Sequence, residues 1–267
     1  DYPPFSFLCD ENNPINLSFE VPRVKDDHGA WSYSAINDSM SYGTIVYDTF
    51  VKYLGEPPLE DKIRIRAHFG SEISPTGYET AYWDGVYVNI HGIIDVSKMA
   101  TLDIIAHEVG HGVLSRISHL KAYDNELSMD ARTLHEAFGD MSGVMVKYDF
   151  TGELNWIHGE ESGSRVRYLD RIKTEASAIA SFSDYDAAGD NYYLRIGMIT
   201  YPFYLLTNKW GVESAYEVML YAAENCWRSD STLPHAANCI KQAAADNNLS
   251  VEEVREAFNT VGITLDN

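Results

Sequence analysis

Two histidines one helical turn apart, His107 and His111, constrain this chain more than any other feature. They lie in a mostly apolar stretch over 102–114, whose spacing predicts a helix. Side chains at i and i+4 share one helix face, so both imidazoles can reach one metal ion. Glu108 is rotated away from that ion and is placed to reach a metal-bound water instead. Taken alone, this HExxH pattern also fits a helix with two ordinary histidines.

A second acidic pattern favours the metal interpretation. Glu136 and Asp140 are four residues apart in the next helical stretch and therefore share a face. A catalytic zinc takes three protein ligands and keeps one position open, which His107, His111 and Glu136 would satisfy. A ligating histidine also needs a carboxylate on its other ring nitrogen, a role that suits Asp140. The alternative is a helix whose carboxylates face solvent. In the zinc site, Glu108 would take a proton from a water whose pKa the metal lowers to about 7.

The hydrophobic spacing predicts an α+β chain with its strands early and its helices late. Strands are expected over 62–69 and 79–91, and residues 149–190 are expected to be rich in loops. Helices are expected over 37–54, 102–117, 134–148, 198–208, 212–225, 236–246 and from Ser250, where Ser250 and Glu253 would form a capping box. We therefore predict a mixed α/β lobe over 1–116, which ends in the HExxH helix, and a helical lobe over 117–267.

The charge and the chain start restrict the partners. Forty acidic residues against 20 basic ones give a formal net charge of −20, which argues against nucleic acid or an anionic membrane as a partner. The charge fits a well-solvated protein; the alternatives are a preference for basic substrates or bound cations. No run approaches the roughly 20 apolar residues of a membrane span. The chain begins at Asp1 without a visible signal peptide, so we expect a processed product, and we expect it to be monomeric.

The chain has three cysteines, an odd number. Cys226 and Cys239 flank a polar loop between two helical segments and could close a short disulfide loop. Cys9 would then be left over, either buried and free or without a partner that a lost N-terminal segment carried. Cysteine zinc ligands are the weaker alternative, because the chain has no CxxC pair.

HEVGH at 107–111, followed by LHEAFGD at 134–140, resembles the thermolysin-like neutral zinc metallopeptidases, above all their pseudolysin branch. The likeness covers nearly the whole chain and includes AIND at 35–38, TAYWDG at 80–85, LDII at 102–105, VRYLD at 166–170, FYLL at 203–206 and AFNTVG at 257–262. The start looks short by one β region. The resemblance implies a thermolysin-like two-lobed fold with zinc in the cleft. It also implies a secreted endopeptidase, made as a precursor with a propeptide, that cleaves peptides or proteins before bulky hydrophobic residues.

The resemblance implies roles for the residues that match the family. His107, His111 and Glu136 match its zinc ligands, and Glu108 matches its general base. Tyr123 matches the tyrosine that donates to the tetrahedral oxyanion.

Other matches concern the substrate. Ala81 matches the edge-strand position that binds the substrate backbone by strand addition. Arg167 matches the arginine beside the S1′ pocket, with Val166 and Ile104 as the apolar lining. Thr80 stands where asparagine is usual, so a side-chain amide for the substrate carbonyl is missing.

The chain departs from the family on the transition-state side of the site. Extra residues around 127–132 lengthen the stretch near Tyr123, and His135 stands where asparagine is usual. Tyr193 occupies the position of a histidine that helps to stabilise the transition state. A tyrosine can donate a hydrogen bond but carries no positive charge near neutral pH, and the loss of one such donor costs about 2.7–4 kcal/mol of barrier. Alternatively, His158 or His235 approaches from another loop.

These departures leave competing functions open. A catalytically weakened thermolysin-fold protein could serve as a peptide-binding, toxin-like or regulatory module, although Glu108, Tyr123 and the full ligand set oppose this. A zinc hydrolase of a non-peptide amide or ester would need the same residues. We predict the peptidase.

A calcium site of the family is also altered. Asp103 and Glu160 remain from it, but Lys147, Val144 and Asn155 occupy positions of other ligands. Calcium needs several oxygen ligands, so we expect it to be absent and replaced by a salt bridge of Lys147. The alternative is that Lys147 points to solvent.

Overall fold

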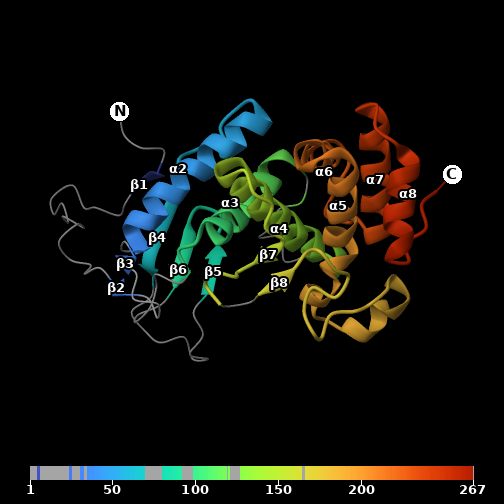
Figure 1. Cartoon of the computed structure of the whole chain (residues 1–267), viewed down its shortest axis with the longest axis horizontal. Coiled ribbons are helices and arrows are strands. Elements are labelled where there is room, and N and C mark those ends of the chain that lie inside the picture. Colours follow the sequence, from blue (N-terminus) through green and yellow to red (C-terminus); the bar gives the residue numbers. More distant parts are fainter. Residues whose placement is uncertain are drawn as a thin grey trace.

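The computed structural model describes residues 5–6, 24–25, 31–32, 35–69, 80–91, 99–118, 120, 127–163 and 166–266. The strands are β1 Phe5–Ser6, β2 Val24–Lys25, β3 Trp31–Ser32, β4 Ile63–Phe69, β5 Thr80–Trp83, β6 Val88–His91, β7 Ile157–His158 and β8 Arg167–Tyr168. The α-helices are α2 Ala35–Leu54, α3 Leu102–Ile117, α4 Met129–Thr151, α5 Gly197–Trp210, α6 Val212–Asn225, α7 Leu233–Asp246 and α8 Val251–Thr260; two 3-10 helices, η2 Phe182–Ala188 and η3 Tyr192–Arg195, precede α5. Strands thus gather in the first part of the chain and helices in the second (Figure 1).

The first part of the chain builds a four-stranded sheet with the strand order β1-β4-β6-β5 and a separate antiparallel pair of β2 and β3. β1 and β6 run parallel to β4, whereas β5 pairs antiparallel with β6 in the register Ala81↔Ile90 and Trp83↔Val88. The single strand expected over 79–91 is therefore a hairpin of two strands. Asp84 stabilises its turn, because its Oδ1 accepts hydrogen bonds from the backbone N–H groups of Val86 and Tyr87 at 3.0 and 2.8 Å. β5 and β1 are the two edge strands of this sheet.

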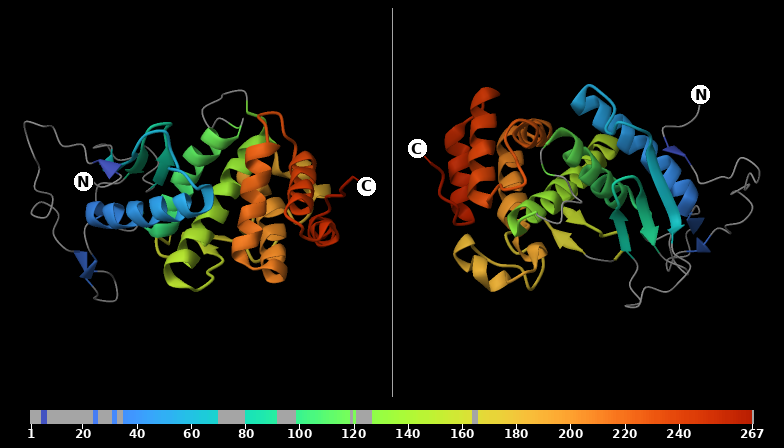
Figure 2. Two further views of the ribbon diagram at one scale, coloured as in Figure 1. Left: turned by 90° about the horizontal axis from the view of Figure 1, so that it is seen from above. Right: turned by 180° about the vertical axis from the view of Figure 1, so that it is seen from behind.

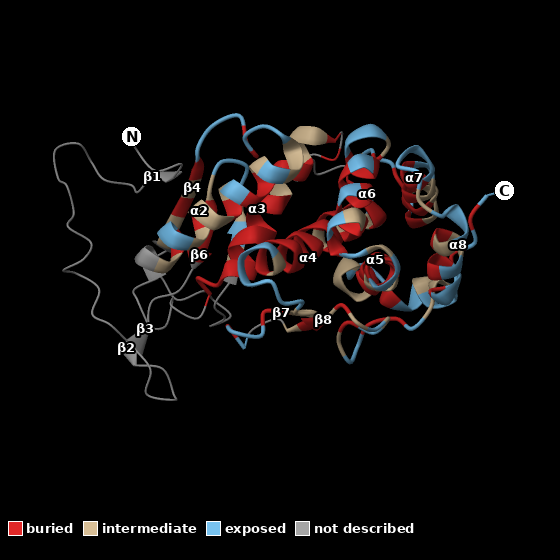
Figure 3. Cartoon of the chain, turned by 45° about the horizontal axis from the view of Figure 1, so that its top comes forward, coloured by how far each residue is buried: buried red, intermediate tan, exposed pale blue. Residues whose placement is uncertain are grey.

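Helices α3 and α4 lie side by side at the centre of the molecule (Figures 1 and 2). Most residues of α3 and α4 are buried, and Figure 3 shows much of both helices in red. Their close approach depends on small residues: a Cβ atom added to Gly139 would lie 2.6 Å from Nδ1 of His107, and one on Gly143 would lie 3.1 Å from the Asp103 carbonyl oxygen. Glycine at these positions lets the two motif helices share one site.

Helix α4 begins five residues before the predicted start at residue 134. The Ser128 side chain accepts a hydrogen bond from the backbone N–H of Ala131 at 3.1 Å, which caps the new first turn. Residues 129–132, predicted as extra loop, are therefore helical. At the other end of the chain, Ser250 caps α8 by accepting from the N–H of Glu253 at 3.3 Å, as predicted.

Helices α5 to α8 pack beyond α4 and form the helical end of the molecule (Figure 1). Their buried faces are rich in Ala, Val, Ile, Leu and Phe and join the same hydrophobic core as α3 and α4. Among the described residues, no helix has both the length and the apolar character that a membrane crossing requires.

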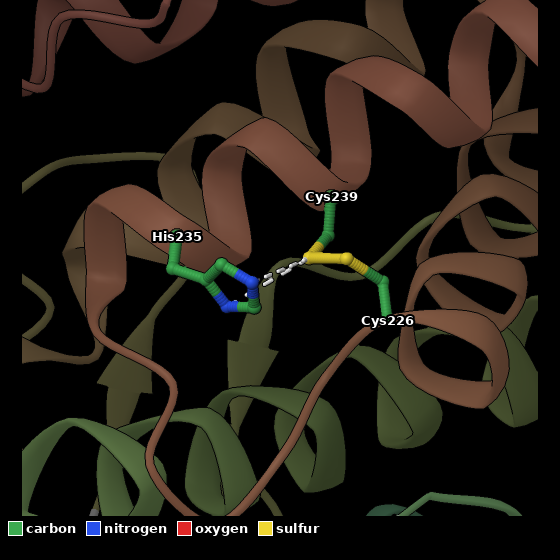
Figure 4. Close-up of side chains that lie close together, drawn as sticks. All are labelled: Cys226, His235 and Cys239. Carbon is green, nitrogen blue, oxygen red and sulfur yellow. Dashed lines mark hydrogen bonds between the residues drawn. A yellow bond between two sulfur atoms is a disulfide. The ribbon is translucent and has the colours of Figure 1, made fainter.

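A disulfide bond joins Cys226, just after α6, to Cys239 in α7 (Figure 4). The two Cα atoms lie 5.7 Å apart, and the bond closes a loop with a sequence separation of 13. The pairing that the sequence left open is thus present. Both sulfur atoms near His235 are therefore in a disulfide and not free thiols. The position of Cys9 lies outside the described residues.

We expect the double variant Cys226→Ser/Cys239→Ser to lose about 3 kcal/mol of stability, because cross-linking a loop of this length removes entropy from the unfolded chain. The thermal midpoint should fall by roughly 6–12 °C, measured by circular dichroism. Cys9→Ser serves as the control. An unchanged midpoint in the double variant would show that this disulfide does not constrain the unfolded chain.

Candidate metal centre and active site

A cavity of about 230 Å³ lies where α3, α4, the β5 edge, η3 and the β7–β8 pair meet. It is lined by Ala81, Tyr82, Trp83, Met99, Ile104, His107, Glu108, His111, Leu127, Arg132, His135, Glu136, His158, Arg167, Tyr192 and Tyr193. The motif residues of both helices therefore open into one space, together with residues from β5, η3, β7 and β8 and with Met99 and Leu127.

Three donor atoms converge in this cavity. Nε2 of His107 lies 3.3 Å from Oε2 of Glu136, and Nε2 of His111 lies 3.7 Å from Oε1 of the same carboxylate. One donor atom of each residue lies within 4.8 Å of the other two. Two imidazoles and one carboxylate are a usual donor set for catalytic zinc, with a further position left for water or substrate. The residues present therefore fit a zinc ion.

Asp140 fixes the orientation of His107. Its Oδ1 lies 2.9 Å from Nδ1 of His107. Arg167 donates from Nε to Oδ2 at 2.8 Å and from Nη2 to Oδ1 at 2.5 Å. Burial alone would raise the pKa of Asp140, but Arg167 and the histidines hold it well below its usual range. An ionised carboxylate only accepts hydrogen bonds. Nδ1 of His107 therefore carries a proton, so a metal ion at this position would take the Nε2 lone pair in place of the proton that Nε2 otherwise shares with Glu136.

His135 plays the matching part for His111, which sequence reasoning missed. Nε2 of His135 lies 3.0 Å from the Leu120 carbonyl oxygen, and its Nδ1 lies 3.4 Å from Nδ1 of His111. A carbonyl only accepts, so Nε2 of His135 is the protonated nitrogen and Nδ1 is left as an acceptor. Burial lowers the pKa of His135 to about 4, which keeps the ring neutral. His111 then donates through Nδ1 and keeps its Nε2 lone pair for a metal. The sequence signal was the histidine directly before Glu136.

The charges of the ligand set favour a cation. Burial would raise the pKa of Glu136, but the hydrogen bond from His107 and the charges of His111 and His107 lower it to about 2. For His111, burial lowers the pKa to about 3. Burial also would lower the pKa of His107, yet its hydrogen bonds to Asp140 and Glu136 raise it to about 10. A cation at the Nε2 atoms replaces that proton, so metal binding is linked to proton release.

Glu108 stands beside the ligands but faces the cavity. It is 7% exposed, and its Oε2 lies 4.0 Å from Nε2 of His111. Burial raises its pKa to about 7, opposed by His107 and by a hydrogen bond from the backbone of Trp83 in β5. A carboxyl group with a pKa near neutrality can both take and return a proton.

The remaining predicted residues divide into three groups. Ala81, Ile104, Arg167 and Tyr193 line the cavity. Val166 is half-buried beside Arg167 and does not line it. Tyr123 lies outside the described residues.

Of the two alternative histidines, only His158 reaches the cavity. His235 lies beside the disulfide (Figure 4). Its Nδ1 is 3.0 Å from the Ser231 hydroxyl.

Lys147 is buried rather than directed to solvent. Its Nζ lies 2.9 Å from Oε1 of Glu161, a partner that the sequence did not single out. Burial would lower the pKa of Lys147, but Asp103 and Glu161 raise it. Nearby, Asn155 donates from Nδ2 to Oε2 of Glu160 at 2.8 Å. In this region the Lys147 ammonium thus pairs with Glu161, and the Asn155 amide donates to Glu160.

Comparison with known proteins places the fold and the donor set in one family. The model of the thermolysin metallopeptidase catalytic domain matches residues 8–115, and the model of the α-helical domain matches residues 126–263. The chain belongs to the thermolysin metallopeptidase family, which confirms the predicted α+β, two-lobed fold class; membership of the pseudolysin branch stays a prediction.

Individual relatives agree with this assignment. The chain is 31% identical over 265 residues to the hemagglutinin/proteinase of Vibrio cholerae serotype O1, an alignment that covers 97% of this chain and 40% of the relative. It is 27% identical over 254 residues to the zinc metalloproteinase MspA of Legionella longbeachae, covering 90% and 46%. The chain therefore spans less than half the length of either relative. The precursor of protealysin, a metalloproteinase from Serratia proteamaculans, shares the fold with a TM-score of 0.70 at 19% identity, covering 90% of this chain and 82% of that one.

Proposed function

We propose that this chain is a zinc-dependent metalloendopeptidase that hydrolyses peptide bonds with Glu108 as general base. The convergence of His107, His111 and Glu136 on one point, with Glu108 facing the same cavity, carries the proposal. When bound there, zinc would polarise a carbonyl group and lower the pKa of a water molecule. A peptide-binding module without activity has less support, because binding alone needs no buried base beside the ligands.

Glu108 would perform both proton transfers. Its raised pKa lets the carboxylate accept a proton as water attacks the peptide carbonyl and then donate it to the leaving amine. Asp140 and His135 act before the reaction: each keeps the Nε2 lone pair of one ligating histidine directed into the cavity.

The oxyanion that forms during attack needs a donor, and we assign this part to Tyr193 together with Tyr123. Tyr193 lines the cavity, and the centroid of its ring lies 6.0 Å from Cζ of Arg167. Removal of one such donor costs about 10²–10³-fold in kcat. We expect Tyr193→Phe to lower kcat to this extent with little change in KM; an unchanged kcat would exclude the hydroxyl from the reaction.

We propose that the substrate binds as an extended peptide along β5. This strand is one of the two edges of the four-stranded sheet, and its Ala81 and Trp83 line the cavity beside Glu108. An exposed edge offers backbone groups for strand addition. Ile104, Met99 and Leu127 supply apolar surface, which favours cleavage before bulky hydrophobic residues.

Cleavage of casein and of an internally quenched peptide library tests the function. We expect hydrolysis at internal bonds, loss of hydrolysis on dialysis against 1,10-phenanthroline, and recovery on addition of equimolar zinc. A chain that binds one zinc per molecule yet cleaves no peptide in the library contradicts the proposal.

We also propose that Lys147 takes the place of a bound calcium ion. The paired and buried ammonium supports this. A ligand that binds only the native state raises stability, so millimolar calcium or EGTA should leave the thermal midpoint unchanged within about 1 °C when Lys147 replaces the ion. A crystal grown with calcium that holds the ion within ligand distance of Asp103 would overturn this assignment.

We further propose that the enzyme is secreted, made as a precursor with a propeptide, and monomeric, with its lobes dividing near residue 116. The Cys226–Cys239 disulfide supports an oxidising compartment. N-terminal sequencing of enzyme from the culture medium tests processing, and analytical ultracentrifugation tests the monomer; intracellular retention or a stable dimer would contradict these parts.

A further inference from the structure

His158 is a buried histidine that the catalytic arrangement leaves unused. It lies in β7, paired across the strands with Arg167 of β8, and both residues line the cavity. The backbone N–H of Gly159 donates to Oδ2 of Asp103 at 2.8 Å, which holds β7 against the first turn of α3 next to Ile104. The ring is 7% exposed, and its centroid lies 4.9 Å from that of His107. The imidazole of His158 therefore forms part of the cavity wall, together with the apolar Ile104 and the charged Arg167.

The two ring nitrogens of His158 have different surroundings. Nδ1 is buried without a hydrogen bond and lies 3.6 Å from Oδ1 of Asp140, a carboxylate that Arg167 already holds ionised. The acceptor-only carboxylate favours a proton on Nδ1. Nε2 then carries the lone pair, and within the described part of the chain it forms no hydrogen bond, although His158 lines the cavity. The ring is buried and lies opposite the positively charged Arg167 in the strand pair, and both conditions favour its neutral form.

We infer that His158 is a specificity-determining residue that accepts a hydrogen bond from the substrate side chain following the cleaved bond. The pocket beside Arg167 then takes bulky side chains whose far end carries a donor. Tyrosine should be preferred to phenylalanine there, and glutamine to methionine. Once a bound substrate excludes water from the cavity, an Nε2 acceptor left without a donor is costly, and a donor on the substrate side chain removes that cost. This inference rests on the proposed function, because it specifies the substrate of the same site.

Matched peptides that differ only in this side chain test the inference. For the wild type we expect kcat/KM to be about fivefold higher for tyrosine than for phenylalanine, the effect of one hydrogen bond. His158→Leu should abolish or reverse the ratio, and His158→Gln, which keeps an acceptor, should restore part of it. His235→Leu, a histidine replaced outside the cavity, should leave the ratio unchanged. Zinc content of each variant, measured by atomic absorption, should stay at one per chain.

A binding measurement separates this inference from the proposed function. The dissociation constants of the same peptides are measured by calorimetry on Glu108→Gln protein, alone and combined with His158→Leu. If the tyrosine peptide binds more tightly but the wild type cleaves no peptide, the proposed peptidase function is contradicted and the role of His158 is not. Equal affinities for tyrosine and phenylalanine peptides, or a ratio that His158→Leu leaves unchanged, would overturn the role of His158.

Discussion

Replacing Glu108 with glutamine is expected to lower kcat/KM by about 10²–10⁴-fold, the usual contribution of a general base. The amide has the size of the carboxyl group but cannot take a proton. Glu108 faces the cavity and lies outside the three converging donor atoms, so zinc binding should persist. The fold should persist as well, because burial raises the pKa of Glu108 and thus already disfavours its charged form.

Kinetics on a quenched peptide, zinc content and the thermal midpoint together give the readout. Glu136→Gln is the informative companion, because it alters a proposed ligand one helix away and should lose zinc and activity together. Exposed Glu153→Gln should change neither. Retention of more than a tenth of the wild-type kcat/KM by Glu108→Gln would show that another group takes the proton.

The local parts of the site could be predicted from the sequence, because helical spacing alone places side chains on a common face. His107 with His111, and Glu136 with Asp140, are pairs of this kind. Their convergence depends on how closely α3 approaches α4, and the resemblance supplied that step. The physical reason, a glycine at 139 under the His107 ring, becomes visible only in the folded chain.

Contacts between distant segments could not be predicted in this way. His135 faces the Leu120 carbonyl, and His158 arrives from a two-residue strand within a stretch expected to be loops. Neither contact follows from a regular spacing of residues along a helix or strand. Only the tertiary packing therefore shows which group each histidine faces. The start of α4 was missed for a related reason: residues 129–132 looked like an insertion, and the Ser128 cap extends the helix over them.

Replacing Arg167 with methionine is expected to destabilise the protein by about 3–5 kcal/mol, because it leaves the buried Asp140 carboxylate without its cation. Asp140 is fully buried and Arg167 is 4% exposed, so water cannot take over the lost hydrogen bonds. The thermal midpoint should fall by roughly 6–20 °C. Asp140 also orients His107, so zinc affinity should weaken by about tenfold or more, as for other groups behind a metal ligand.

Arg171→Met is the matched control, because Arg171 forms the same kind of contact to Asp170 at 2.8 Å but has a half-exposed side chain. Exposed ion pairs contribute about 0–1 kcal/mol, so its midpoint and zinc affinity should stay near the wild type. Thermal unfolding and competition with a fluorescent zinc chelator measure both quantities. Equal losses in the two variants would mean that burial of the Arg167–Asp140 pair contributes nothing specific. If Arg167→Met is destabilised but its zinc affinity is unchanged, Asp140 orients His107 without help from the guanidinium. The Arg167–Asp140 pair would then contribute to the stability of the fold and not to zinc binding.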